Sequence, residues 1–348
     1  MNLVDCYIMS KDEITAKWEN GELTIINDAL LPLFLKRVHS VDLWLETRAI
    51  DSHRANSRLL KKALRLRERD DISTVLNVNA ATIADAYWIK PLDSDLNYDD
   101  IRFSDDYFSE LALKGTYDNF NNAANHKNSR TPELTNVGSF EKCWKLIDGK
   151  WQMYKQANKE EQFSEVFICK LGKKLGMNMA EYTLGEDCVI SKDFTDAGTV
   201  IFEPAFTFMG DNEDYEDVIR PLETLCPDAI KDYIQMIFID TICLNPDRHT
   251  ANFGLLREPD TGKIIGAAPC FDHNMALISR GYPKMPGDND LLINLFNEVI
   301  AEHQEFSEFI PEISKETLDE IAASIDLDVD KEYVTNLIFE RYRMIIRQ

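Results

Sequence analysis

The chain has 348 residues, of which 44% are hydrophobic and 28% charged, a balance typical of globular proteins and more sequence than one core usually needs. Its formal net charge of −23 opposes any general affinity for phosphate backbones, so we expect no direct binding of nucleic acid. No run approaches the ~20 apolar residues of a membrane helix, and residues 1–5 lack a basic-then-apolar signal, so we expect a cytoplasmic protein without membrane contact.

Seven cysteines are scattered through the chain, and no two of them form a Cys-x-x-Cys pair. An odd, dispersed set argues against both a disulfide framework and a zinc site. We therefore predict buried free thiols.

The N-terminal part is predicted to mix strands with short helices. Residues 4–27 carry β-rich runs separated by turn residues, which predicts a small antiparallel sheet. A helical pattern begins at Ser57, inside the most basic stretch, residues 54–69, which we interpret as a solvated helix face rather than a docking patch. Residues 72–90 resemble a short helical pair that ends in an extended aromatic segment, and we expect this pair to pack against the next domain rather than to read DNA.

A polar, asparagine-rich stretch, residues 116–130, has little to bury, so we predict a surface loop and a domain boundary there. Residues 131–206 then carry the pattern of a small nucleotide-binding lobe. Two strands, residues 143–147 and 151–156, are joined by an Asp-Gly dipeptide that favours a tight hairpin turn. A helix is predicted from about residue 161 to 175, where a glycine follows as a natural helix end.

The rest of the chain, residues 207–348, is predicted to be mostly helical. The segment 228–244 is apolar nearly all round, which marks a buried central helix. A strand hairpin and three amphipathic helices follow it. The chain is therefore expected to divide into an N-terminal α+β subdomain (1–130), a small lobe (131–206) and a helical lobe (207–348).

The ten residues 245–254, Asn-Pro-Asp-Arg-His-Thr-Ala-Asn-Phe-Gly, come directly after the buried helix. Asp247 and Asn252 lie five residues apart within them, and Asp272 comes twenty residues after Asn252. A carboxylate that orients an attacking hydroxyl, followed by two oxygen ligands for Mg²⁺, is the arrangement that ATP-dependent phosphoryl transfer needs in a protein-kinase-like lobe. The sequence therefore predicts Asp247 as the base, and Asn252 and Asp272 as ligands of magnesium.

Residues earlier in the chain carry the complementary chemistry for binding ATP. The Gly138-Ser139 turn allows backbone N–H groups to approach phosphate closely, because glycine has no side chain in the way. Lys155, on the second predicted strand, is placed to hold the α- and β-phosphates. Glu165, ten residues later on a helix, is placed to pair with Lys155 and fix its aim.

Each of these residues alone has a simpler explanation. An isolated Asp-x-x-x-x-Asn is as often a turn held by side-chain-to-backbone hydrogen bonds, Lys155 a surface lysine, and Glu165 a solvated helix residue. His249 alone indicates a hydrogen-bonded structural histidine, so we give it only a supporting role beside the cofactor, and His273 stays unassigned. The specific signal is the order of the elements: glycine turn, strand lysine, helix glutamate, buried helix, Asp-Arg-His loop and Phe-Asp.

Residues 245–254, followed by the run Pro-Cys-Phe-Asp that ends at Asp272, resemble the corresponding motifs of the HipA-like serine/threonine kinases. These bacterial kinases are often the toxin half of toxin–antitoxin systems. The resemblance is dense from about residue 136. It implies that Asp247 is the catalytic aspartate, that Asn252 and Asp272 hold magnesium, and that Lys155 binds phosphate.

The phosphate loop of that family carries a serine that can be autophosphorylated, which shuts off ATP binding. Ser139 is the matching hydroxyl in this chain. The loop Gly138-Ser139-Phe140 departs from the family pattern, because it has one glycine and because Phe140 and Glu141 are larger than the usual residues.

We therefore predict an α+β, protein-kinase-like two-lobed fold, with a small β-rich lobe, a mostly helical large lobe and an N-terminal α+β subdomain. The predicted function is an ATP- and Mg²⁺-dependent serine/threonine kinase acting on an unidentified protein, and the resemblance implies an antitoxin partner. Two alternatives stay open: a kinase of a small molecule, and a pseudokinase or binding module that acts through a transcriptional partner. The intact set of Lys155, Asp247, Asn252 and Asp272 argues against a dead enzyme.

Overall fold

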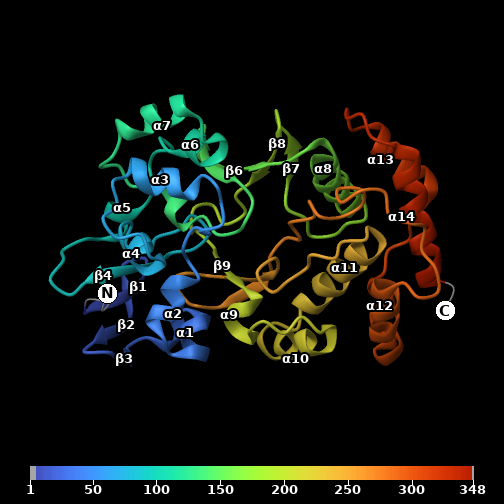
Figure 1. Ribbon diagram of the computed structural model, residues 1–348. Coiled ribbons are helices and arrows are strands. Elements are labelled where there is room, and N and C mark those ends of the chain that lie inside the picture. The colour runs from blue at the N-terminus through green and yellow to red at the C-terminus, as the bar shows by residue number, and fades with distance from the viewer. Residues whose placement is uncertain (1–4, 347–348) are drawn as a thin grey trace. The chain divides into compact units, whose positions relative to one another are not determined.

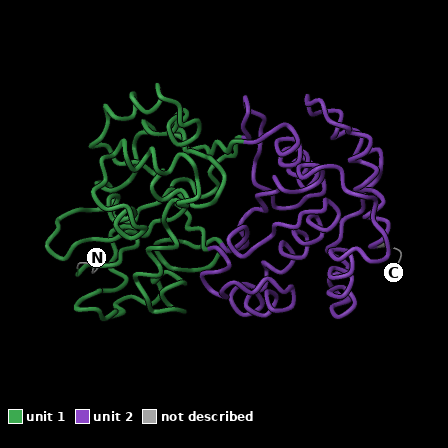
Figure 2. The backbone as a smooth tube through the Cα atoms, in the orientation of Figure 1, with its two compact units in different colours: residues 1–156, 190–203, 256–265 green, residues 157–189, 204–255, 266–348 purple. Residues whose placement is uncertain are grey.

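The computed structural model describes residues 5–346 and divides them into two compact units. The first unit contains the described residues up to 156 together with 190–203 and 256–265, and the second contains the remainder (Figure 2). Residues 1–4, where the sequence predicts the start of the first sheet and no targeting signal, lie outside the described part. The predicted functional division into three parts stays a prediction, because compactness alone does not assign a role to a segment.

The first unit begins with a four-stranded antiparallel sheet in the order β3-β2-β1-β4 (Figure 1). The strands are β1 (Cys6–Ser10), β2 (Glu13–Glu19), β3 (Glu22–Ile25) and β4 (Tyr87–Pro91). Strand β1 lies between β2 and β4, and its pairing with β2 carries a register shift between Ile8 and Met9. The predicted small sheet is therefore confirmed over its described residues, and the aromatic segment near residue 88 is its fourth strand.

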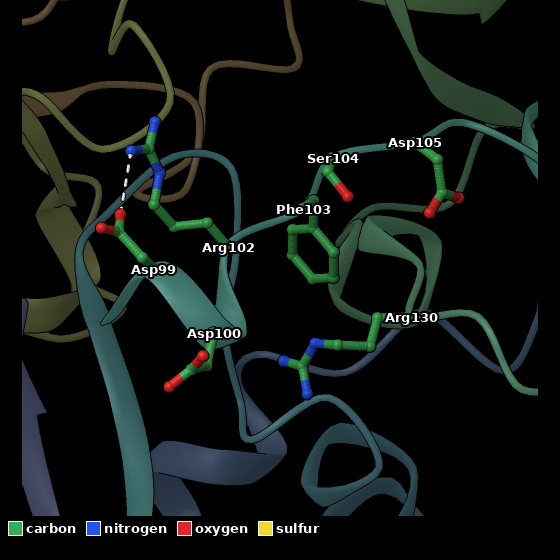
Figure 3. Close-up of a pocket in the computed structure, with 7 residues that line it drawn as sticks. All are labelled: Asp99, Asp100, Arg102, Phe103, Ser104, Asp105 and Arg130. Atoms are coloured by element: carbon green, nitrogen blue, oxygen red, sulfur yellow. Dashed lines mark ion pairs between the residues drawn. The ribbon is translucent and has the colours of Figure 1, made fainter. Parts of the chain in front are cut away.

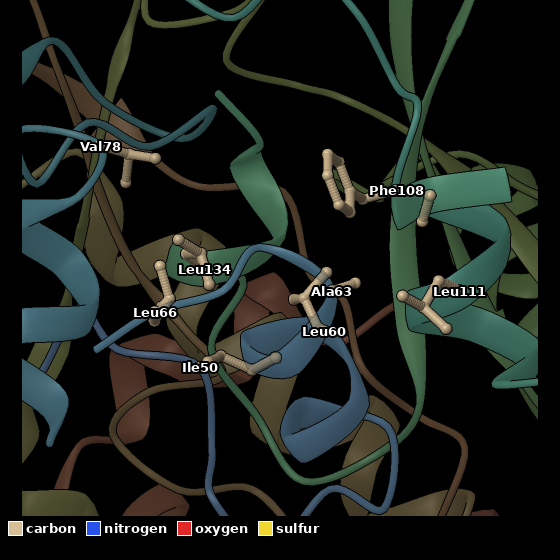
Figure 4. Close-up of a cluster of buried hydrophobic side chains, with 9 residues drawn as sticks. Ile50, Leu60, Ala63, Leu66, Val78, Phe108, Leu111 and Leu134 are labelled. Carbon is tan, nitrogen blue, oxygen red and sulfur yellow. The ribbon is translucent and has the colours of Figure 1, made fainter. Parts of the chain in front are cut away.

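The first unit contains short helices, and some of them share one apolar cluster (Figure 4). The cluster includes Leu60 from α3, Leu111 from α6 and Leu134, all fully buried. The helices are α1 (Leu33–Val38), α2 (Val41–Glu46), α3 (Ser57–Ala63), α4 (Asp71–Leu76), α5 (Tyr98–Ile101), α6 (Ser109–Lys114) and α7 (Tyr117–Ala124), with 3-10 turns at Asp28–Leu30 and Pro132–Thr135.

Two local predictions about this region are wrong, and a third holds in part. Residues 72–90 contain only one helix, α4, because residues 77–86 form turns before β4. The stretch 116–130 is not a loop, since it contains α7, whose Ala123 joins the apolar cluster. The basic stretch is mostly solvated, as predicted, but Arg54 and Lys61 are buried and donate hydrogen bonds to backbone carbonyls. Its exposed basic residues are Arg58, Lys62, Arg65, Arg67 and Arg69.

The predicted hairpin of the small lobe is confirmed as β5 (Lys142–Ile147) and β6 (Lys150–Gln156), paired antiparallel. Asp148 and Gly149 at its turn have φ angles of 51° and 77°. Two positive φ angles match the right-handed twist of the flanking strands, which explains why the Asp-Gly dipeptide predicts this hairpin correctly. The register places Lys142 directly opposite Lys155.

The second unit is mostly helical, as predicted. Its first helix, α8 (Lys159–Lys174), begins with a reciprocal capping box between Asn158 and Glu161 and is followed by Gly176 at φ 76°. The predicted buried helix is α11 (Ala229–Ile242), which packs against α10, α12 and α14 (Figure 1). The remaining helices are α9 (Ala205–Met209), α10 (Tyr215–Leu225), α12 (Leu291–Glu302), a 3-10 helix (Gln304–Phe309), α13 (Lys315–Ala323) and α14 (Lys331–Ile346).

The remaining strands are short. They are β7 (Tyr182–Leu184), β8 (Cys188–Lys192), β9 (Ile201–Pro204), β10 (Gly254–Arg257) and β11 (Ile264–Ala267), in the orders β5-β6-β8-β7 and β11-β10-β9.

Among residues 5–346, no helix is long and apolar enough to cross a membrane. Within the same residues no disulfide joins any cysteine, and six of the seven are buried, as predicted.

Candidate active site

The Asp-Arg-His loop leaves the end of α11 by a sharp turn. Leu244, just past the helix, has a φ of 51°, and the next residue, Asn245, folds back onto Asp240. Its backbone N–H donates to the Asp240 carbonyl at 2.9 Å, and its side-chain Nδ2 donates to the Asp240 carboxylate at 2.7 Å. The last turn of the buried helix therefore sets the starting point of the loop.

Arg248 forms a two-pronged ion pair with Asp240. Its Nε donates to Oδ2 at 2.7 Å and its Nη2 donates to Oδ1 at 3.0 Å, and both side chains are buried. Burial opposes the charge on the guanidinium, but the adjacent Asp240 carboxylate outweighs it and raises the pKa of Arg248 above its ordinary value. This pair gives the loop a rigid base inside the helical unit.

The same guanidinium joins two segments of the chain. Its Nη1 donates to the carbonyl oxygen of Asn252 at 2.6 Å and to that of Phe271 at 2.6 Å. Phe271 immediately precedes Asp272, so the backbones of the two predicted magnesium ligands lie next to each other around one nitrogen atom. The structure thus brings together Asn252 and Asp272, which are twenty residues apart in the chain.

Hydrogen bonds within the loop orient its functional side chains. The backbone N–H of Asp247 donates to Asn245 Oδ1 at 3.3 Å, and its carboxylate belongs to a half-buried residue. The Nδ2 atom of Asn252 donates to the Asp247 carbonyl at 3.3 Å, which assigns Oδ1 as the acceptor atom of that amide. The ring of His249 accepts from the N–H of Ala251 at 3.3 Å, and its predicted supporting role beside the cofactor stays a prediction.

Asp272 sits on a strained piece of backbone. Its φ is 63°, in the left-handed region that costs a non-glycine residue on the order of 1 kcal/mol or more. Its N–H donates to Tyr182 Oη at 3.1 Å, and this bond helps to hold the conformation. Burial, with the nearby carboxylates of Glu165 and Asp272, raises the pKa of Tyr182 well above its ordinary value, so the tyrosine stays a neutral acceptor and donor.

His273, which the sequence leaves unassigned, is a structural link behind the loop. It is fully buried; its N–H donates to Glu165 Oε2 at 2.9 Å, and its Nε2 lies 3.3 Å from Cys270 Sγ and 3.8 Å from Asp240 Oδ1. Burial alone would lower the pKa of His273, but Cys270 and Glu165 outweigh it and raise the pKa to about 10. The sequence signal for this role is its position directly after Asp272.

Glu165 is fully buried rather than exposed in an open cleft. It lies on α8 in the second unit, whereas Lys155 lies on β6 in the first. The predicted pairing of these two residues stays a prediction.

The first unit holds the predicted phosphate loop between the 3-10 turn Pro132–Thr135 and β5. Gly138 has a φ of 112°, a conformation that other residues rarely adopt, and a Cβ added there would overlap the Nζ of Lys142. Ser139 is exposed. The Nζ of Lys155 lies 4.8 Å from the centre of the Phe140 ring, a cation–π contact that positions the ammonium group near the loop.

Two charged residues, Glu141 and Lys142, follow Phe140 at the end of this loop. Glu141 does not project its charge into the loop: its Oε1 accepts from the N–H of Asn56 at 3.1 Å, and its Oε2 lies 3.9 Å from Arg54 Nε. Lys142, which the sequence analysis does not single out, reaches Gly138 and pairs in register with Lys155. Two lysines on one face of a strand pair, beside a glycine turn, suit an anionic ligand.

A separate pocket of about 400 Å³ lies elsewhere in the first unit (Figure 3). Its lining mixes both signs of charge, with Asp100, Asp105 and Arg130 around the space and an ion pair of 3.6 Å between Asp99 and Arg102. None of the residues that the sequence predicts as functional lines it.

Comparisons with known proteins find similarity to solved structures. No protein-family model and no curated protein matches the chain. The structure of HipA from Shewanella oneidensis MR-1, in a toxin–antitoxin complex with HipB and operator DNA, matches with a TM-score of 0.52, 13% identity and 97% coverage of both chains. The chain has a HipA-like fold.

A second solved structure, the Helicobacter pylori proinflammatory kinase CtkA, is 18% identical and matches with a TM-score of 0.47 over 59% of this chain and 91% of that one. The HipA-like fold confirms the fold class and the resemblance predicted from the motifs around Asp247 and Asp272. At this level of identity, the likeness concerns the fold and leaves the chemistry of the site to its own residues.

Proposed function

We propose that the protein is an ATP- and Mg²⁺-dependent serine/threonine kinase. The observation that carries the proposal is the set of contacts around Arg248, which is paired with Asp240 and donates to the carbonyls of Asn252 and Phe271. A non-catalytic binding protein does not require an Asp-Arg-His loop and a Phe-Asp segment to meet at one buried guanidinium. Phosphoryl transfer needs this positioning more than it needs covalent chemistry.

The residues of the second unit fit a magnesium ion. Carboxylate and amide oxygens are the hard ligands that this ion prefers, and the hydrogen bond from Asn252 Nδ2 to the Asp247 carbonyl leaves Oδ1 for coordination. Asn252 and Asp272 would hold the ion, which when bound offsets the charge of the phosphates. Asp247 orients the attacking hydroxyl and accepts its proton. His249 and Glu165 act as supports of the loop and of the Phe-Asp segment.

The phosphates are assigned to the loop and strand of the first unit. The backbone at Gly138 and Ser139 offers N–H groups, Lys155 and Lys142 offer ammonium groups, and Phe140 holds Lys155 in place. The exposed hydroxyl of Ser139 is proposed as a site of autophosphorylation. These assignments rest on the sequence pattern together with the local geometry of the loop.

The proposed partner is a DNA-binding antitoxin of the HipB type. The HipA structure that this chain resembles over 97% of both lengths contains HipB and operator DNA. A partner that carries the basic surface would let a chain of net charge −23 act at DNA without touching it.

The test is phosphate incorporation from labelled ATP with Mg²⁺, comparing the wild type with Asp247→Ala. The exposed acid Asp326, changed to alanine, is the matched control, and all three proteins must first melt at similar temperatures. Label on serine or threonine in the wild type and the control, but not in Asp247→Ala, is the expected result. Transfer that survives in Asp247→Ala would overturn the role of this aspartate.

An unlabelled wild type that still binds ATP with Mg²⁺ would favour a small-molecule substrate. A wild type that neither transfers phosphate nor binds ATP after phosphatase treatment would favour a pseudokinase.

A further inference from the structure

Arg54, from the turn before α3, spans the two ends of the predicted phosphate loop. Its Nη1 donates to the carbonyl of Asn136 at 2.7 Å, and its Nη2 donates to the carbonyl of Lys142 at 2.7 Å. These two residues flank the loop on either side, and Arg54 itself is buried. One planar group therefore fixes the distance between the points where the loop leaves and re-enters regular structure.

A buried carboxylate, that of Glu133, also spans this loop. Oε2 of Glu133 accepts from Asn136 Nδ2 at 3.1 Å, and Oε1 accepts from the N–H of Trp144 at 2.7 Å. One of these partners precedes the loop and the other follows it, so Glu133 repeats the bridging pattern of Arg54. The stems of the loop are thus tied twice, by Arg54 and by Glu133.

Arg54 also determines where the acidic residue of the loop goes. Glu141 Oε2 lies 3.9 Å from Arg54 Nε, and Glu141 Oε1 accepts from the N–H of Asn56, two residues after Arg54. The carboxylate is held against the turn that carries Arg54. Its charge is therefore directed at the Arg54 guanidinium and the Asn56 N–H.

A loop of this kind binds phosphate only when its N–H groups converge. Residues 137–141 have no helix or strand of their own, and Ser139 is exposed, so little inside the loop fixes its shape. Ordering such a segment at the moment of binding would cost affinity, whereas a preformed loop avoids that cost. Hydrogen bonds from Arg54 to both ends of the loop would hold it in one conformation before ATP binds.

We infer that Arg54 is a positioning residue for the phosphate-binding loop: it fixes the loop from behind and turns Glu141 away, without touching ATP itself. This inference rests on the proposed function. It adds that a residue some 80 positions earlier in the chain sets the affinity for the outer phosphates of ATP.

The test compares Arg54→Met with Arg58→Met, an exposed arginine of α3 that serves as the matched control. Binding of ATP and of AMP is titrated in the full-length proteins, because AMP lacks the phosphates that the loop would hold. Arg54→Met is expected to weaken ATP binding by about tenfold and to leave AMP binding within about twofold, with Arg58→Met unchanged for both. In turnover, the KM for ATP should rise while kcat changes little.

A purely structural role for Arg54 would weaken both nucleotides equally, or neither, and either outcome overturns the inference. If Arg54→Met fails to fold, Arg54→Lys replaces it, since one ammonium group cannot span both carbonyls, and the same comparison is decisive. A wild type that binds no ATP would remove the proposed function and this inference together. Wild-type binding with an unaffected Arg54 variant would remove the inference alone.

Discussion

The carboxylate of Asp240 and the guanidinium of Arg248 face each other with two hydrogen bonds, of 2.7 and 3.0 Å, in the interior of the helical unit. Replacing Arg248 by methionine would leave the Asp240 charge buried without this partner. Breaking a buried pair in this way typically costs about 3–5 kcal/mol, so Arg248→Met should unfold at clearly lower urea concentration and lose phosphoryl transfer. Equilibrium unfolding and labelled-ATP assays measure the two effects.

A double variant separates the charge from the contacts. Asp240→Asn combined with Arg248→Met removes both charges and should recover part of the lost stability, but not the transfer activity. Equal stability of Arg248→Met and the wild type would show that the pair has no role in holding the loop.

Asp272 is predicted to set the dependence on magnesium. Asp272→Ala should lose the Mg²⁺-dependent part of ATP affinity, because Asn252 alone offers one neutral oxygen. Alanine keeps the N–H that donates to Tyr182, so this backbone contact is preserved in the variant. ATP titrations with and without Mg²⁺ measure this, with the exposed Asp288→Ala as control. A full magnesium effect in Asp272→Ala would assign the ligand role to another residue.

The sequence predicted best where local chemistry decides the structure. The Asp148-Gly149 turn, the apolar α11 and the order of residues 245–272 each carry their own signal, and all three agree with the structure. Charged residues that become buried by distant contacts were missed. Arginine is a residue type usually found on the surface, so the sequence gives no reason to expect Arg54 to be buried. It is buried because the carbonyls of Asn136 and Lys142, more than 80 residues later, accept its hydrogen bonds.

The same limit applies to the site. Nothing in the sequence pairs Arg248 with Asp240, because an aspartate inside an apolar helix gives no indication of its partner. His273 could be found only by its position after Asp272, since its contacts to Glu165 and Cys270 come from tertiary structure. Motif order therefore predicts where the chemistry lies, and packing determines which side chains surround the predicted residues.

Gly138 is predicted to be required for its backbone conformation. Alanine at φ 112° is strained by about 1–3 kcal/mol, and its Cβ would displace the Lys142 ammonium group, so Gly138→Ala should weaken ATP binding. Gly149→Ala is the matched control, because Gly149 also has a positive φ but has open space around it and lies at the hairpin turn. It should lower the melting temperature and leave ATP affinity unchanged. Equal effects of both variants on ATP affinity would argue against a phosphate loop at Gly138.

Ser139 is predicted to accept phosphate from the protein's own ATP. Its exposure makes the hydroxyl accessible, and a phosphate there would occupy the N–H groups of its own loop and repel ATP. Ser139→Ala should therefore gain no label on the peptide that contains residue 139 and should keep its ATP affinity after preincubation with ATP. Label that persists on that peptide in Ser139→Ala would place the modification elsewhere.

Glu133 is predicted to make stability depend on pH. Burial raises the pKa of its carboxyl from 4.5 to about 7, against the opposing pull of Arg54, so the folded protein holds this proton more tightly than the unfolded chain does. The stability contributed by the protonated form is present below about pH 4.5 and is lost as the pH rises towards 7, by on the order of 3 kcal/mol.

Glu133→Gln cannot lose a proton, so relative to the wild type it should gain stability between pH 5 and pH 8. Urea unfolding of both proteins at the two pH values measures this difference, in which the other titrating groups, including the nearby Asp106, cancel to first order. A difference between the two proteins that is the same at both pH values would show that Glu133 is charged throughout, with the Arg54 guanidinium outweighing the effect of burial.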